Sequence, residues 1–405
     1  MAAGPSGRRW LMLALGTGGQ AAACVFVYGV PYLIPELRSS DHLSLAQAGL
    51  VVACPTAGLV AALYAWGAAA DRHGERRVLA AGLFAAMAAL LLALAARGTM
   101  ELGAAFVLAG LAGASAFASS GRLVMGWFSA QGRGLAMGVR QTSTPLGMAI
   151  AALAVPPLAH AAGIRGPLIF TAALTGVVAL LIVLLVVDPP RPAAAAAREA
   201  PPSGSPYRTP TLWRVHAASA LLVWPQFTVG AFGLVFLVST QHLTPTAAGR
   251  VMALGQIVAV LMRIGVGRWS DHVGSRLRPV RQLAAATAVV MAALAGCAVW
   301  SITAWVADPL LILACGLTSS DNGLAFTSVA ELAGVRWSGR ALGAQNTGQN
   351  LVASIAPPAV GALIGVAGYA SAFLLAALVA VAAVPVTPLP ETGPAPARRS
   401  PDAIR

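Results

Sequence analysis

Two short stretches of this sequence, 200 residues apart, decide its fold. The first reads GAAADRHGERR from Gly67 to Arg77, and the second reads GVGRWSDHVGSR from Gly265 to Arg276. In both, a glycine is followed by three residues, an aspartate, two residues and a second glycine. A pair of prolines at 156–157 recurs in the same way at 357–358. Self-similarity at this period, in a chain of 405 residues, predicts two related halves.

Apolar runs occupy most of the chain around these stretches. Hydrophobic residues make up 58% of the sequence and charged residues only 10%, whereas soluble domains contain about 25% charged residues. A helix needs about 20 apolar residues to cross a bilayer, and runs of this length, bounded by charged or turn residues, predict twelve crossings. The predicted spans are 10–34, 46–69, 78–96, 102–128, 135–159, 164–187, 213–239, 247–269, 282–304, 309–335, 341–366 and 368–389.

We therefore expect an all-α membrane protein with twelve transmembrane helices in two six-helix bundles related by a parallel repeat. Residues 1–187 are expected to form the N-terminal bundle, and residues 213–390 the C-terminal bundle. The proline- and serine-rich segment 188–212 predicts a cytoplasmic linker, and the polar residues 391–405 predict a cytoplasmic tail.

The distribution of arginine predicts the orientation of the chain in the membrane. All 26 basic residues are arginine, and with both termini inside, 19 of them lie in cytoplasmic segments. Only Arg38, Arg97, Arg165 and Arg250 lie outside. Cytoplasmic loops of membrane proteins carry the excess of arginine. We expect a multi-pass protein of the bacterial inner membrane with both termini in the cytoplasm, and we attribute the net charge of +13 to this bias rather than to nucleic-acid binding.

The first stretch resembles the signature loop of the major facilitator superfamily of transporters. That signature has a glycine, three residues, an aspartate, an arginine, one residue, a glycine and then basic residues. The pattern departs at Ala69, often leucine in the family, and at Glu75, which is usually basic. The resemblance implies that both loops gate a transporter that works by alternating access. The residues that carry it are Gly67, Asp71, Arg72, Gly74 and Arg76, and in the degenerate second copy Gly267 and Asp271.

Physical chemistry supports the same interpretation of the first loop. Glycines permit a tight turn and a close approach of two helices. Asp71 is favourable beside the N-terminus of a neighbouring helix, and the arginines hold the loop in the cytoplasm. The alternative is an ordinary positively charged hairpin with no gating role.

The stretch RGLAMGVRQTSTPLG, from Arg133 to Gly147, resembles the fifth helix of bacterial importers of anions and organic acids. Arg122 and Arg140 are predicted at similar depth on adjacent helices, and two such cations in lipid need an anion or a carboxylate partner. Arginine forms bidentate bonds with carboxylates and other oxyanions, which favours an anionic substrate. The alternatives for Arg122 are snorkelling to the interface or pairing with Asp71 or Glu331.

Asp321, next to Asn322, is expected near the middle of its span, about 18 Å deep at a rise of about 1.5 Å per residue. A carboxylate at that depth is a candidate proton-coupling site; the alternative is a structural aspartate held by hydroxyls or an arginine. Arg263 lies one turn before Gly267, so we expect it near the cytoplasmic end of its helix, in a gating or interfacial role. Glu331 is expected to be an ion-pair partner at the end of its own helix.

In the family, helices 1, 4, 7 and 10 line a central cavity. The resemblance therefore places polar residues of these helices beside the two arginines as substrate contacts, and helix 11 adds another. Each of them alone is more often a packing contact between helices than a ligand contact. These candidates are Gln20, Tyr28, Gln226, Asn322 and Gln345.

Several signatures are absent from the sequence. The chain has no lysine and so cannot complete a GxxxxGK[ST] phosphate-binding loop, and transport is expected to run on an ion gradient rather than on ATP. The six histidines and four cysteines have no metal-ligand spacing. We expect no cofactor, no metal and no enzymatic activity.

Together these features predict a monomeric secondary transporter, embedded in lipid, that imports a small organic or inorganic anion with protons. A proton-driven exporter of amphipathic compounds is the first alternative, and in that case aromatic residues would dominate the cavity. A transporter-like membrane sensor is the second. It would need a docking surface for a cytoplasmic partner, and the segment 188–212 is short and of low complexity.

Overall fold

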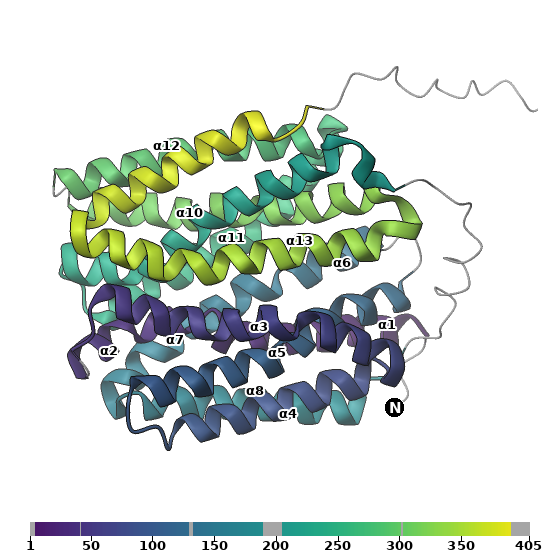
Figure 1. Cartoon of the computed structure of the whole chain (residues 1–405), viewed down its shortest axis with the longest axis horizontal. Coiled ribbons are helices and arrows are strands. Elements are labelled where there is room, and N and C mark those ends of the chain that lie inside the picture. Colours follow the sequence, from purple (N-terminus) through teal and green to yellow (C-terminus); the bar gives the residue numbers. More distant parts are fainter. Residues whose placement is uncertain (1–4, 41, 129–132, 189–204, 301–302, 390–405) are drawn as a thin grey trace, which may run out of the picture.

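The computed structural model describes residues 5–40, 42–128, 133–188, 205–300 and 303–389, and every regular element within these ranges is a helix (Figure 1). The N-terminal elements are α1 (Pro5–Val27), the 3-10 turn η1 (Val30–Leu33), α2 (Ile34–Ser40), α3 (Leu45–His73), α4 (Glu75–Ala93), α5 (Thr99–Trp127), α6 (Arg133–Gln141), α7 (Ser143–Ala162) and α8 (Arg165–Leu185). The C-terminal elements are η2 (Pro206–Arg208), α10 (Pro210–Thr240), α11 (Pro245–Val273), α12 (Leu277–Val299) and α13 (Ala304–Val386).

The described chain crosses the membrane twelve times, as the apolar runs predict. Eleven segments are long and apolar enough to span a bilayer. The last of these, Trp337–Val386, holds two crossings, because the backbone leaves helical geometry at Gly368, where φ is 76°. A second break, at Gly334 with φ of 69°, separates this segment from the crossing before it. Both breaks use a positive φ, which glycine adopts without steric penalty.

The outer surface of the bundle is apolar. Val366, Met100 and Trp305 are 91%, 90% and 87% exposed. Large apolar side chains at such exposure are unfavourable in water and favourable against lipid.

The sequence repeat extends to the backbone. Helices α3 and α11 each contain 29 residues, and their bounds differ by 200 at both ends. Both begin at a hydroxyl N-cap, Ser44 and Thr244, whose side-chain oxygens accept hydrogen bonds from the third residue beyond at 3.2 Å. The N-terminal helices, purple to blue in Figure 1, lie together on one side of the molecule, and the C-terminal helices, green to yellow, lie on the other.

The two ends of the bundle differ. We call the end at which α8 finishes and α10 begins the linker end, and the end at which α3 and α11 begin the far end. At the far end, a Cβ at Gly49 of α3 would lie 2.6 Å from the carbonyl oxygen of Pro357. In the same way, a Cβ at Gly249 of α11 would overlap the carbonyl oxygen of Ala152 and approach Pro156. The glycines are 200 residues apart and the prolines 201, so the repeat forms two equivalent close contacts between the halves, and these close the far end.

Candidate functional site

A cavity of 780 Å³ lies between the two halves and is lined by residues of α1, α3, α5, α6, α7, α10, α11 and α13. Tyr64 of α3 and Arg340 of α13 belong to its wall and are exposed. Both lie near the linker end, so the cavity opens there.

The cavity is closed toward the far end by a contact between the halves. The hydroxyl of Tyr28, which follows α1, donates a hydrogen bond of 2.8 Å to Oδ1 of Asn350 in α13. The Tyr28 ring also packs edge-on against Phe117 of α5 and Phe227 of α10, with ring centroids 5.9 and 5.5 Å apart. Both halves therefore contribute to the closed end of the cavity.

The charged side chains that line the cavity are the four arginines 122, 140, 263 and 340, and no aspartate or glutamate is among the described lining residues. Within the described ranges, no group of three or more His, Cys, Asp or Glu side chains is placed to hold a metal ion. A molecule in the cavity would thus meet positive charge and neutral polar groups.

Arg140, in the last turn of α6, is buried in the cavity wall, and its hydrogen-bond partners among the described residues are all neutral. Its Nε and Nη2 donate to the Ser120 hydroxyl at 3.2 and 3.0 Å, and Nη2 also donates to the Phe117 carbonyl at 3.3 Å. Nη1 donates to the side-chain oxygen of Gln141 at 3.1 Å. Ser120 in turn donates to Gln20 Oε1 at 2.8 Å. A buried guanidinium without a carboxylate partner is a strong site for an anion.

Arg122 of α5 lines the cavity but faces the first gating loop. Its Nη2 donates to the Gly67 carbonyl at 3.2 Å, and its Nε lies 3.8 Å from Oε1 of Glu75. Arg122 thus has an ion-pair partner that the sequence did not suggest, Glu75 at the start of α4. Of the two suggested partners, Glu331 pairs with Arg276 and the Asp71 side chain lies outside the described part of the structure. Arg122 connects the cavity wall to the gating loop, whereas Arg140 faces the cavity contents.

Arg263 lines the cavity at mid-helix, which corrects the expectation that it lies near the end of its helix. Helix α11 continues for ten residues beyond Arg263, to Val273, because the charged residues after Gly267 extend the helix instead of ending it. The Arg263 Nε donates to the Ser319 carbonyl at 2.8 Å, and its Nη1 donates to the Gln141 carbonyl.

The C-terminal half adds a chain of amides to the wall. The Asn322 side chain donates to Gln226 Oε1 at 3.1 Å, and the Gln349 amide donates to Asn322 Oδ1 and to the Ser219 hydroxyl, both at 2.6 Å. Gln226, Asn322 and Gln349 all line the cavity. The structure thus brings together Gln20, Tyr28, Arg122, Arg140, Gln226 and Asn322 of the residues predicted from the sequence.

Two predicted residues lie behind the cavity wall. Asp321 is only 3% exposed and is not among the lining residues, although it lies two residues after Ser319, whose carbonyl accepts a hydrogen bond from Arg263. Gln345 is turned toward α10, where its side-chain oxygen contacts Nδ1 of His216. Nε2 of the same histidine lies 3.2 Å from the Tyr207 hydroxyl. Gln345 therefore joins the C-terminal helices to the segment before α10.

The first gating loop depends on a residue that follows α8. Gly74 has φ of 86° and ψ of 162°, and a Cβ there would overlap the carboxylate of Asp188. That carboxylate accepts a 2.7 Å hydrogen bond from the backbone N–H of Arg76, in the first turn of α4. The Arg76 guanidinium donates to the Val183 carbonyl in the last turn of α8. The other predicted gating residues here are Gly67, whose carbonyl binds Arg122, the exposed Arg72, and Asp71, whose side chain lies outside the described part of the structure.

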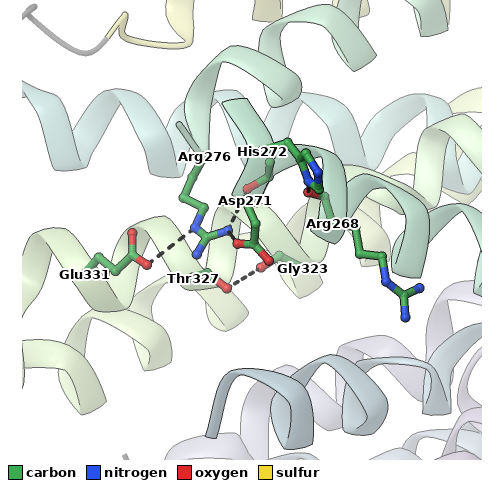
Figure 2. A network of polar contacts seen from close by, with 8 residues as sticks. Arg268, Asp271, His272, Arg276, Gly323, Thr327 and Glu331 are labelled. Atoms are coloured by element: carbon green, nitrogen blue, oxygen red, sulfur yellow. Dashed lines mark hydrogen bonds and ion pairs between the residues drawn. The ribbon is translucent and has the colours of Figure 1, made fainter. Parts of the chain in front are cut away.

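The second gating loop, shown in Figure 2, is centred on Arg276. Its guanidinium donates to the Asp271 carboxylate and, at 2.7 Å, to the Ser270 hydroxyl. Its Nε also lies 3.5 Å from Oε1 of Glu331 of α13, so Glu331 has the partner at its helix end that we expected. Gly274 ends α11 in the left-handed conformation, and a Cβ at Gly267 would meet no atom within 4 Å.

Twelve crossings in two repeated halves around one cavity define a membrane transporter. Residues 16–357 match the sequence profile of the Major Facilitator Superfamily, and the chain belongs to this superfamily, which consists of transporters and not of enzymes. Over 385 residues it is 42% identical to an uncharacterized MFS-type transporter found in two strains of Mycobacterium tuberculosis. The match covers 95% of this chain and 85% of that protein.

Two solved structures share the fold. Both are of a bacterial homolog of the human lysosomal transporter Spinster. Its inward-facing and occupied form has a TM-score of 0.77 and 15% identity, over 95% of this chain and 97% of that one. Its inward-facing and unoccupied form has a TM-score of 0.70 and 16% identity, and the match covers 94% of this chain and 95% of that one.

Proposed function

We propose that this transporter imports a small organic anion together with protons across the bacterial inner membrane, by alternating access. The observation that carries the proposal is the charge of the cavity, which is lined by four arginines and, among its described residues, by no carboxylate. Positive charge in a cleft with low-dielectric walls attracts and holds anions. Because Arg140 bonds neutral groups among the described residues, an anion beside it would supply an opposite charge.

The rest of the wall favours an organic anion over an inorganic one. Phe117, Phe227 and Met148 line the cavity together with the amides of Gln226 and Asn322. A ligand with an acidic group on Arg140 and an apolar or hydrogen-bonding body on the C-terminal half would contact both halves. Ligand pockets commonly combine a mostly apolar wall with a few polar groups that fix orientation.

Proton coupling is assigned to Asp321. Its buried carboxylate lies two residues after Ser319, whose carbonyl accepts a hydrogen bond from the cavity arginine Arg263. A proton on Asp321 removes the negative charge beside Arg263 and so strengthens the hold of the cavity on an anion, and loss of that proton weakens it. We assign the linker end, which carries most of the arginine, to the cytoplasm, and on this assignment the cavity opens to the cytoplasm.

The anion site is tested with Arg140→Gln. Loss of a charge-assisted bond is expected to weaken binding by about tenfold to a hundredfold, since such bonds contribute about 1.5–3 kcal/mol. Thermal stability of the purified protein would be measured with carboxylates such as benzoate, and with uncharged amides such as benzamide as matched ligands. Arg340→Gln, at the exposed mouth, is the control and should change little.

The second candidate function is export of amphipathic compounds, which the aromatic and methionine lining of the cavity favours. The same measurement distinguishes it from anion import. For export, neutral amphipathic ligands would stabilise the protein and Arg140→Gln would be tolerated.

The coupling assignment is tested with Asp321→Asn, which keeps a hydrogen-bonding side chain of the same size but cannot titrate. In proteoliposomes, accumulation of the anion driven by a proton gradient should collapse, while exchange of labelled for unlabelled anion should persist. Accumulation at the wild-type level would show that the proton binds elsewhere.

A further inference from the structure

The crossing that carries Arg140 is broken one residue later. Helix α6 ends at Gln141 and α7 begins at Ser143. In a continuous helix the carbonyl of Gln141 would accept the N–H of residue 145, but that residue is Pro145, which has no N–H. The next carbonyl, of Thr142, does receive its helical donor, since the N–H of Leu146 reaches it at 3.0 Å. The sequence thus leaves the Gln141 carbonyl without its helical partner.

Arg263 supplies the missing donor from the other half of the molecule. Its Nη1 donates to the Gln141 carbonyl, while its Nε is held by the Ser319 carbonyl at 2.8 Å. Gln141 belongs to the N-terminal half, and Arg263 and Ser319 belong to the C-terminal half. Both residues are partly buried in the cavity wall, and breaking such a bond without replacing it costs free energy.

The bond is made by α11, the helix that also packs against α7 at the far end. Gly249 and Arg263 are both on α11, fourteen residues or about 21 Å apart. At Gly249 the contact with α7 is a close backbone approach, whereas at Arg263 it is a single polar bond to the break between α6 and α7. When one half rocks against the other, the close contact at Gly249 can be kept as a pivot. The hydrogen bond from Arg263 is directional and tolerates only a small displacement.

We propose that Arg263 is a positioning residue that ties the two halves together in the empty transporter, through the carbonyl that Pro145 leaves free. The tie stabilises the conformation that is open at the linker end, and it breaks when the halves rock to the opposite conformation. A contact shifts a conformational equilibrium only if one of the two states lacks it. The proposal concerns the protein without ligand, so it is independent of the anion assignment.

The test measures the distance between the halves at the mouth of the cavity. Spin labels are placed at Tyr64→Cys and Ala344→Cys, which line the mouth from α3 and α13, after alanine replaces the four native cysteines. Distance distributions are recorded by pulsed electron spin resonance on the full chain in lipid nanodiscs, without ligand. Pro145→Ala leaves every charge of the cavity in place and gives the Gln141 carbonyl a helical donor.

Arg263→Gln is expected to raise the ratio of short to long distances by about tenfold, the effect of losing one charge-assisted bond. Pro145→Ala should raise it less, because its new N–H only competes with Arg263 for the Gln141 carbonyl, which can accept two donors. The double variant should shift no further than Arg263→Gln alone, because Pro145→Ala acts through the bond that Arg263→Gln has already removed. Pro157→Ala, which restores a donor elsewhere in α7, should match the wild type. Wild-type distances in Arg263→Gln, or additive shifts in the double variant, would overturn the proposal.

Discussion

The two gating loops share a sequence pattern, but the charges that join each loop to its neighbouring helix are reversed. In the N-terminal half the arginine is on the membrane helix, Arg122 of α5, and its partner Glu75 is at the loop, 3.8 Å away. In the C-terminal half the arginine is in the loop, Arg276, and its partner Glu331 is on the membrane helix, 3.5 Å away. Both halves therefore have an ion pair between loop and helix, but the loop carries the negative charge in the first half and the positive charge in the second.

The loops also differ in how the helix that follows them is capped. The first turn of α4 receives its cap from Asp188, 112 residues from its partner Arg76 in the sequence. The first turn of α12 receives its cap locally, from the Ser275 hydroxyl, which accepts the Arg278 N–H at 3.3 Å. The first loop is thus joined to the chain that leaves the N-terminal half, whereas the second loop is more self-contained.

The largest difference between the loops is expected at the glycine that ends each helix. Gly74→Ala should destabilise the protein by about 3 kcal/mol, because its φ and ψ suit only glycine and the new Cβ would displace Asp188. Gly274→Ala should destabilise by only about 1 kcal/mol, since its left-handed conformation is less restrictive and its surroundings are open. Denaturant unfolding in detergent would measure both, and equal effects would contradict the proposed difference.

A smaller difference is expected at the caps. Asp188→Ala removes a carboxylate from the N-terminus of α4 and should destabilise by about 1–2 kcal/mol, whereas Ser275→Ala should destabilise by about 0.5 kcal/mol. Asp188→Asn, which retains an oxygen acceptor, is the matched control and should recover most of the loss. The same unfolding measurement applies, and a larger effect at Ser275 than at Asp188 would show that the first loop does not depend on the chain after α8.

The smallest effects are expected at the ion pairs. The Glu75 side chain is 14% exposed and that of Glu331 is 57% exposed. Coupling energies from double-mutant cycles should be about 1 kcal/mol for Glu75→Gln with Arg122→Gln, and below about 0.5 kcal/mol for Glu331→Gln with Arg276→Gln. Raising the salt concentration should weaken the second pair more than the first. A larger coupling energy for the second pair than for the first would contradict this prediction.

The sequence predicted some of the cavity and missed other parts for identifiable reasons. Arg140 was placed in the site because an arginine two turns inside a span needs a polar environment. Arg263 was assigned to the helix end because the charged residues after it resemble a loop, yet α11 runs on to Val273. Gln345 belongs to a polar cluster whose amides point in several directions, and only packing of α13 on α10 turns it toward His216.

The sequence by itself determined the fold class, the twelve crossings, the repeat and the positions of the two loops that we predict to gate transport. These follow from the length of apolar runs and the spacing of glycines and aspartates, which are local properties of the chain. Tertiary structure alone decided the partners: Glu75 for Arg122, Asp188 for the first turn of α4, Arg263 for the Gln141 carbonyl, and a cavity wall whose described charges are all positive. Each of these contacts joins residues far apart in the sequence, and the way the helices pack determines which side chains meet.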